Sequence, residues 1–180
     1  GLYAAGDVSC VAKGYLTGAF VFGQIAAEQS VRFAASCPRP KADPAQVDGV
    51  KDKIAKRAAR ADKRIDVRDV EYKVRRLIND YLVSPKNDYK LSRWLEWSEI
   101  FRKEKDYDVS TANVHDLVKS FEVENIVKCA TYSAVASLER KESRWGNAHQ
   151  RTDYPKLDDS SWLCHVDVQK GGYDEVTCLK

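Results

Sequence analysis

The feature that most constrains the fold is the stretch 43–142, in which apolar side chains recur every three or four positions among charged ones. This spacing is typical of amphipathic helices that bury one face. Proline, serine and aspartate at the breaks in the pattern mark where such helices begin and end. We therefore predict four helices, over 43–61, from Asp66 or Asp69 to Ser84, over 88–105 and over 113–142.

The residues before this stretch have a different character. Residues 1–36 are small and apolar, with an extended start that ends at Gly6-Asp7 and a helix predicted over 17–35. Pro38 and Pro40 disfavour helix in the residues before them, so 37–44 is predicted to be a linker. The helical bundle domain is then predicted to cover 45–142.

The residues after the bundle change again. An irregular polar and aromatic stretch covers 143–160, and the sequence from Trp162 to Val168 then alternates with period two. Gly171-Gly172 can form a tight turn, from which Tyr173–Leu179 returns as a second strand. The predicted fold is thus mainly α, with a helical bundle followed by an irregular segment and a C-terminal β-hairpin within 143–180.

Composition excludes several classes of function. The chain has 30 lysines and arginines against 27 acidic residues, so we expect no nucleic-acid partner. Lys13, Gln24 and Glu28 interrupt the most apolar segment, so we expect no membrane insertion. An odd number of widely spaced cysteines predicts reduced thiols, a cytoplasmic location and no metal site made by this chain alone. These cysteines are Cys10, Cys37, Cys129, Cys164 and Cys178.

Two separated motifs carry a resemblance to a known family. The first is Gly1-Leu2-Tyr3-Ala4-Ala5-Gly6-Asp7 followed by Ala19-Phe20-Val21-Phe22-Gly23-Gln24-Ile25-Ala26. The second runs from Glu142-Ser143-Arg144-Trp145-Gly146-Asn147-Ala148-His149 through Gln150-Arg151-Thr152-Asp153-Tyr154-Pro155 to Trp162. The chain resembles the C-terminal part of the fumarate reductase and succinate dehydrogenase superfamily of FAD flavoproteins, most of all adenylylsulfate reductase alpha subunits.

The resemblance implies a function for the glycine-rich start. Residues 1–36 would be the C-terminal end of a flavin-binding α/β domain, and the chain would be a portion of a longer FAD-dependent oxidoreductase of sulfur metabolism. An iron-sulfur subunit would exchange electrons with the flavin, and the remainder of the flavoprotein would complete the FAD site. The cofactor-binding residues implied are Gly6, Asp7, Tyr15, Leu16 and Thr17.

The catalytic residues and the substrate stay open at this point. Lys13, Arg144 and His149 are candidates, although His149 can equally shape a domain junction. No arginine falls within 10–13, where fumarate reductases place one for a substrate carboxylate, and this argues against a dicarboxylate substrate. The alternatives are a fumarate reductase or succinate dehydrogenase-like flavoprotein with a different substrate, and a cofactor-free helical interaction module.

Overall fold

A computed structural model of the chain describes residues 1–9, 15–104, 109–170 and 176–179. The described residues form two compact units, Gly1–Gly49 and Val50–Lys180, and each is considered by itself. The helices are η1 (Gly6–Val8), α1 (Tyr15–Ser36), α2 (Pro44–Ala58), α3 (Val67–Tyr81), α4 (Asp88–Glu104), α5 (Val114–Glu139), η2 (Gly146–Ala148) and α6 (Asp159–Trp162). The strands are β1 (Asp167–Lys170) and β2 (Val176–Leu179). The prediction of a mainly helical fold is confirmed.

The helices begin where their capping residues predict. The Asp66 carboxylate accepts a hydrogen bond from the Arg68 amide at the start of α3, and the Asn113 side chain accepts one from the Asp116 amide at the start of α5. Asp43 accepts from the Ala45 amide at the start of α2. Each side chain thereby satisfies one of the amides that a helix N-terminus leaves without a partner.

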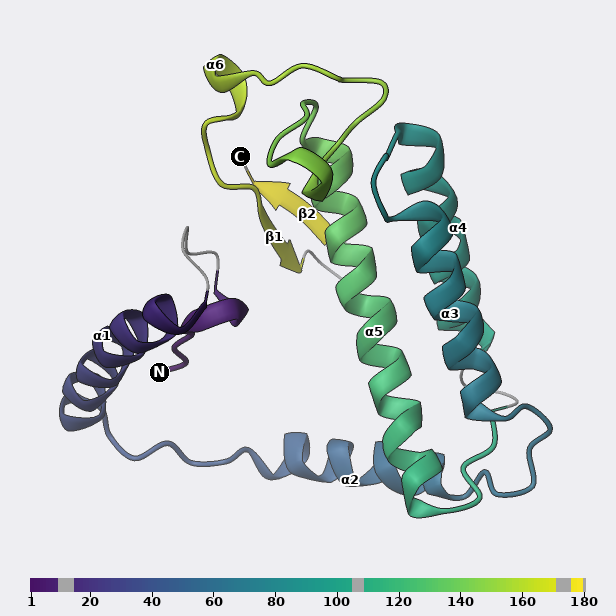
Figure 1. The fold of residues 1–180 in the computed structure, drawn as a ribbon. Helices are drawn as coiled ribbons and strands as arrows, with labels where there is room; N and C mark the ends of the chain where they lie inside the picture. Colours follow the sequence, from purple (N-terminus) through teal and green to yellow (C-terminus); the bar gives the residue numbers. More distant parts are fainter. Residues whose placement is uncertain (10–14, 105–108, 171–175, 180) are drawn as a thin grey trace. The chain divides into compact units, whose positions relative to one another are not determined.

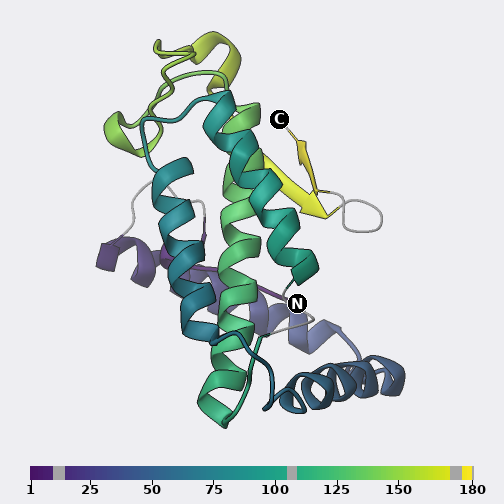
Figure 2. The ribbon, with the colours of Figure 1, turned by 90° about the vertical axis from the view of Figure 1, so that its right-hand side faces the viewer.

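The core of the second unit lies between α3, α4 and α5, which run side by side in both ribbon views (Figure 1 and Figure 2). Trp94 and Leu91 of α4 are fully buried, as is Val74 of α3, while α5 contributes the small residues Ala130 and Ala134. Small side chains on one helix leave room for large ones on its neighbours, so the three helices interdigitate. The other core residues are Val67, Leu82, Phe101, Val109 and Val123.

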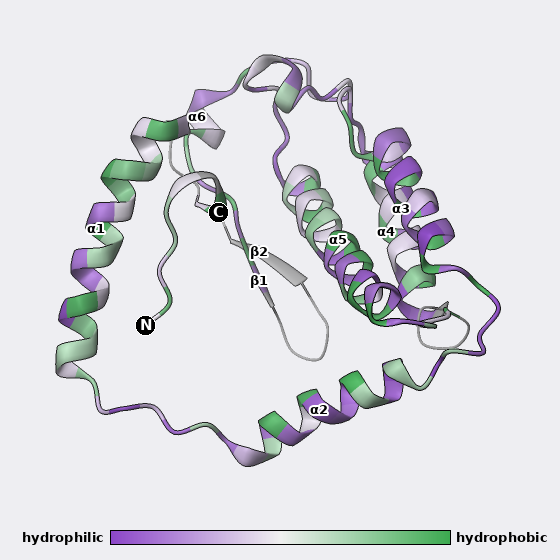
Figure 3. Ribbon diagram, turned by 60° about the horizontal axis from the view of Figure 1, so that its bottom comes forward, coloured by the Kyte–Doolittle hydropathy of each residue, from purple (hydrophilic) through white to green (hydrophobic). Residues whose placement is uncertain are grey.

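The first unit buries little apolar surface. The start of the chain returns along α1, where Gly1 lies against the ring of Phe33 and the Tyr3 hydroxyl donates to the Gln29 carbonyl at 3.3 Å. Gly18 is the one residue of α1 that is buried, and hydrophobic segments follow the helix along its length in Figure 3. An exposed apolar surface of this kind is typical of an interface. Its large side chains include Leu2, Tyr15, Leu16, Phe20, Val21, Ile25, Val31 and Phe33.

The tail corrects one prediction. The period-two alternation from Trp162 to Val168 predicts a strand, but the structure places Trp162 in the short helix α6, where it is buried, and β1 begins at Asp167. β1 pairs antiparallel with β2, four residues in each strand, with Asp167 opposite Leu179. Both strands lie beside α5 (Figure 1). The predicted turn at Gly171-Gly172 lies outside the described residues.

No helix within the described ranges is both long and apolar enough to cross a bilayer. The division into domains at 1–36, 37–44, 45–142 and 143–180 stays a prediction.

Candidate functional site

The glycine-rich turn of the first unit contains the predicted cofactor-binding residues. Gly6 is buried and has a φ of +75°, a left-handed conformation that glycine adopts without strain. A Cβ at this position would lie 3.5 Å from the Cβ of Ala19, so the backbone passes close to α1. Ser9 stabilises the turn, because its hydroxyl donates to the Gly6 carbonyl at 2.7 Å. The sequence thus forms a compact backbone turn that packs against α1.

The N-terminus of α1 presents the other predicted residues. Tyr15 is 91% exposed and has a φ of +67°, and Leu16 and Thr17 are also exposed. The first amides of a 22-residue helix carry a partial positive charge, which favours an anionic group nearby. The side chain of Asp7 and all of Lys13 lie outside the described residues, so their predicted roles remain predictions.

A buried carboxylate organises the tail of the second unit. Glu142 is 0% exposed, and its Oε1 accepts from Arg140 Nη1 at 2.7 Å and from Arg144 Nε at 2.6 Å. Its Oε2 accepts from Arg144 Nη2 at 3.0 Å and from the Asp158 amide at 2.9 Å. Burial raises the pKa of Glu142, but these hydrogen bonds outweigh it and lower the pKa to about 2. Glu142 is therefore ionised at neutral pH, and it joins the end of α5 to the tail.

Arg144 is held in this arrangement. Besides its bonds to Glu142, Arg144 donates from Nη2 to Asp159 Oδ1 at 2.7 Å, and its hydrogen bonds to both carboxylates raise its pKa. The neighbouring guanidinium of Arg140 lies between two indole rings, 5.5 Å from the centroid of Trp145 and 5.6 Å from that of Trp162. Cation–π contacts of this kind add to the ion pairs and fix the arginine in place.

Arg151 forms a second buried centre. It is 0% exposed; its Nη2 donates to Asp88 Oδ1 at 2.6 Å and its Nε to Asp153 Oδ1 at 2.8 Å. Its Nη1 donates to the carbonyls of Ser137 and Arg140 at the end of α5. The hydrogen bond from Arg151 lowers the pKa of Asp153 to about 2. One guanidinium thereby connects α4, α5 and the tail.

A short backbone ladder continues this connection. The Lys86 amide donates to the Gln150 carbonyl at 2.8 Å, and the Thr152 amide donates to the Lys86 carbonyl at 2.9 Å. The Lys86 ammonium is buried and donates to Ser137 Oγ at 3.2 Å. Burial and the charge of Arg151 lower the pKa of Lys86. The connection between α3 and α4 is thus bonded directly to the tail.

His149, a catalytic candidate, lies inside this arrangement. It is buried, and its Nε2 lies 3.3 Å from the Arg140 carbonyl, while its own carbonyl accepts from the Arg144 amide at 2.9 Å. Burial lowers its pKa, as do the charges of Lys86, Arg151 and Arg140. This environment disfavours the protonated imidazole, and a catalytic role for His149 or Arg144 stays a prediction.

We call this set the tail network: Lys86, Asp88, Arg140, Glu142, Arg144, His149, Arg151, Asp153 and Asp159. The motif from Glu142 to Asp153 identifies its centre from sequence. Lys86 and Asp88 were missed, because no local pattern indicates a partner more than sixty residues away. Asp158 accepts from the Ser161 amide at 3.1 Å and caps α6.

The two regions differ in what they can do chemically. The tail network has its carboxylates and guanidinium groups paired with one another, an arrangement that holds a fold together. The turn at Gly6 and the N-terminus of α1 fit a flavin cofactor better, since a close backbone, exposed helix amides and exposed apolar side chains converge there. The residues present therefore fit one wall of a flavin site.

Comparison with known proteins identifies the class. The chain superposes on adenylylsulfate reductase from Archaeoglobus fulgidus with a TM-score of 0.82 and 26% identity, over 91% of this chain and 28% of that one. Escherichia coli quinol fumarate reductase shares the fold, with a TM-score of 0.75 and 19% identity over 92% and 29% of the two chains. The chain thus has the fold of one region of these two reductases.

The family follows from sequence. The chain belongs to the fumarate reductase flavoprotein C-terminal family, whose model matches residues 89–178. The succinate dehydrogenase flavoprotein subunit of Rickettsia bellii is 28% identical over 92% of this chain and 30% of its own length. The chain spans about 30% of the length of these relatives.

Proposed function

We propose that this chain is the C-terminal portion of an FAD-dependent oxidoreductase that resembles the adenylylsulfate reductase alpha subunit. The observation that carries the proposal is the similarity to the Archaeoglobus fulgidus enzyme, which extends over 91% of the chain at 26% identity. In this proposal an iron-sulfur subunit exchanges electrons with the flavin, and the protein works in the cytoplasm.

The cofactor role belongs to the first unit. Gly6 would bring the backbone close to FAD, and Asp7 would accept hydrogen bonds from its hydroxyl groups. The amides of Tyr15, Leu16 and Thr17 would face the flavin ring, where the partial positive charge of a helix N-terminus stabilises negative charge. FAD supplies the redox chemistry, and the protein sets its position and electrostatic surroundings.

The exposed apolar surface of α1 supports a further part of the proposal. Leu2 is 98% exposed, and Phe20 and Ile25 are exposed on the same unit. The remainder of the flavoprotein would cover these side chains, because a free-standing module leaves them in water. Lys13 would be the cation of this turn, where it can bind a sulfate or phosphate group as a point charge.

A second candidate function is a succinate dehydrogenase or fumarate reductase activity. It is favoured by the Rickettsia bellii relative, which matches 92% of the chain at 28% identity. The absence of an arginine from residues 10–13 weighs against it. Turnover assays on the purified protein distinguish the two, with adenylylsulfate and sulfite for the first candidate and succinate and fumarate for the second.

The test of the proposal is the visible absorption spectrum of the native protein that carries this chain, with and without reductant. We expect flavin bands that bleach on reduction. Asp7→Ala should reduce the flavin content, whereas Glu28→Ala, which removes an exposed carboxylate of α1, should not. A colourless native protein would contradict the proposal, and full flavin content in the Asp7→Ala variant would remove the role assigned to that residue.

A further inference from the structure

A cavity of about 300 Å³ lies within the second unit, between α3, α4 and α5 and next to the end of α2. It is separate from the tail network, with which it shares no residue. Two backbone hydrogen bonds join the neighbouring segments 60–65 and 110–111. The Ser110 amide donates to the Ile65 carbonyl at 2.8 Å, and the Thr111 amide donates to the Arg60 carbonyl at 3.1 Å. Its apolar lining comes from Ile65, Val67, Val70, Phe101, Val109, Val123 and Val127.

One side of the cavity carries an excess of positive charge. The buried carboxylate of Glu124 accepts from Arg57 Nη2 at 2.7 Å, from Lys53 Nζ at 3.1 Å and from Lys128 Nζ at 2.7 Å. Arg57, Glu124 and Lys128 all line the cavity. Three cations thus contact this carboxylate. Among the described residues that line the cavity, cations outnumber acidic residues by five to three, so the space beside them has a net positive field. The cations are Arg57, Arg60, Lys73, Arg102 and Lys128, and the acidic residues are Asp69, Glu99 and Glu124.

Arg57 has hydrogen-bonding capacity to spare. Its side chain is 5% exposed, and its guanidinium lies 4.0 Å from the ring centroid of Phe121. Nη1 of Arg57 is buried without a hydrogen-bond acceptor in the described part of the chain. A buried donor left unsatisfied costs about 1–3 kcal/mol. Nη1 itself has almost no accessible surface, so an acceptor would bind favourably here once the guanidinium shifts toward the cavity that Arg57 lines.

We propose that this cavity binds a small amphipathic carboxylate, with its anionic head at Arg57 and its hydrocarbon body between α3, α4 and α5. A volume of 300 Å³ is that of about ten water molecules in the liquid, so the occupant has about ten non-hydrogen atoms. Straight-chain octanoate has this size and this combination of charge and apolar surface. The lining favours it over a sugar or an inorganic anion, because seven of the lining side chains are apolar and the hydroxyl groups of Ser98, Thr111, Ser120 and Thr131, which also line the cavity, already donate to backbone carbonyls.

The experiment is a calorimetric titration of the 180-residue chain with octanoate, octan-1-ol and inorganic phosphate as separate probes. We expect saturable 1:1 binding of octanoate, weaker binding of octan-1-ol because it lacks the charge, and no binding of phosphate because it lacks the apolar body. Equal affinities for octanoate and octan-1-ol would overturn the assignment of the anionic head. No saturable binding of octanoate would overturn the proposal as a whole.

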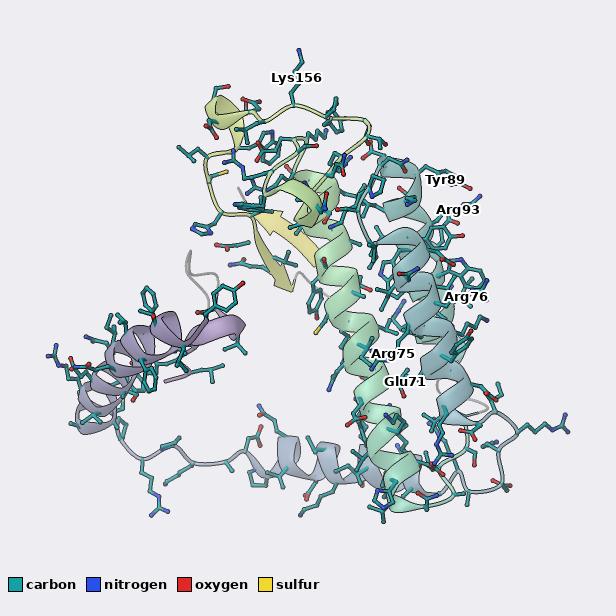
Figure 4. All side chains as sticks on the ribbon, viewed as in Figure 1. Glu71, Arg75, Arg76, Tyr89, Arg93 and Lys156 are labelled. Carbon is teal, nitrogen blue, oxygen red and sulfur yellow. The ribbon has the colours of Figure 1, made fainter. Side chains whose placement is uncertain are left out.

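Variants locate the site. Arg57→Met keeps an unbranched side chain against Phe121 and removes the charge, and a charge-assisted hydrogen bond predicts a roughly tenfold to hundredfold loss of octanoate affinity. Arg93→Met is the matched control, because Arg93 lies on the outer side of α4 (Figure 4) and does not line the cavity. Wild-type affinity in Arg57→Met would overturn the role of Arg57.

A second variant keeps the charge and changes the volume. Val127→Phe adds a ring to the cavity wall and should weaken octanoate binding while Arg57 is retained. It decides the question if Arg57→Met fails to fold. Unchanged octanoate affinity in a folded Val127→Phe variant would place the binding elsewhere. All of these titrations are independent of flavin, so their failure is distinguishable from failure of the proposed oxidoreductase function.

Discussion

Glu142→Gln tests whether the tail network stabilises the fold. The wild-type carboxylate accepts four hydrogen bonds, two on each oxygen, from Arg140, Arg144 and the Asp158 amide. Glutamine has nearly the same shape, but one oxygen becomes an NH₂ group that faces two donors. The substitution therefore removes two hydrogen bonds and the negative charge, and it leaves the Arg140 guanidinium buried against neutral groups.

The expected loss is large for a single isosteric change. Removing one partner of a buried ion pair costs about 3–5 kcal/mol, against a total free energy of unfolding of about 5–15 kcal/mol for a domain. Urea unfolding of the chain at pH 7, followed by circular dichroism at 222 nm, measures this loss. Glu139→Gln is the control, because Glu139 is exposed three residues earlier and should change stability by less than about 0.5 kcal/mol.

The pH dependence provides an independent check. The folded-state pKa of Glu142 is lowered from 4.5 to about 2, so the carboxylate contributes stability above pH 4.5, and this contribution is lost as the pH falls through about 2. The difference in stability between wild type and Glu142→Gln should therefore be constant from pH 7 to pH 5 and decrease below pH 4.5. Equal stability of Glu142→Gln and Glu139→Gln at pH 7 would refute the reasoning.

Two further predictions concern the same network. Arg151→Met should lower the free energy of unfolding by about 3–5 kcal/mol and speed hydrogen exchange of the Thr152 amide, because it leaves Asp88 and Asp153 without their shared cation, whereas Arg93→Met should do neither. His149 has a folded-state pKa below 6.5, so wild-type stability should fall as the pH is lowered below 6.5; His149→Gln should reduce that slope between pH 7 and pH 5, and an unchanged slope would contradict the effect of burial on this imidazole.

The helices could be predicted because their signals are local. Asp66 and Asn113 are capping residues that sit directly before periodic apolar segments, and the structure places both as N-caps. Trp162 shows the limit of this reasoning. The alternation after it is too short to exclude other structures, and the Trp162 carbonyl accepts from Arg140 Nη1 at 2.9 Å, a tertiary contact that favours a helical turn there.

The candidate sites, like the helices, could be predicted from sequence only where their signals are local. The motif around Glu142 and Arg151 could be identified from sequence, but the partners that satisfy it are set by tertiary packing. Lys86 lies in the connection between α3 and α4, Asp88 is the first residue of α4, and the sequence around them gives no sign of the tail. Lys156 of the tail points away from the network (Figure 4). The cavity beside Arg57 arises from four separate segments, so no single stretch of sequence predicts it.

The ladder between Lys86 and residues 150–152 has a consequence for synthesis on the ribosome. α3, α4 and α5 emerge before the tail and can pack as soon as α5 is complete, because their contacts are between helices that are neighbours in the sequence. Arg151 emerges later. Until then, its guanidinium is not there to donate to the carbonyls of Ser137 and Arg140 and to the carboxylate of Asp88. A chain that stops after α5 has a packed bundle in which these acceptors lack the hydrogen bonds from Arg151. The last fifth of the chain therefore completes one end of the bundle by supplying Arg151. A prematurely terminated product exposes unsatisfied hydrogen-bond acceptors at that end.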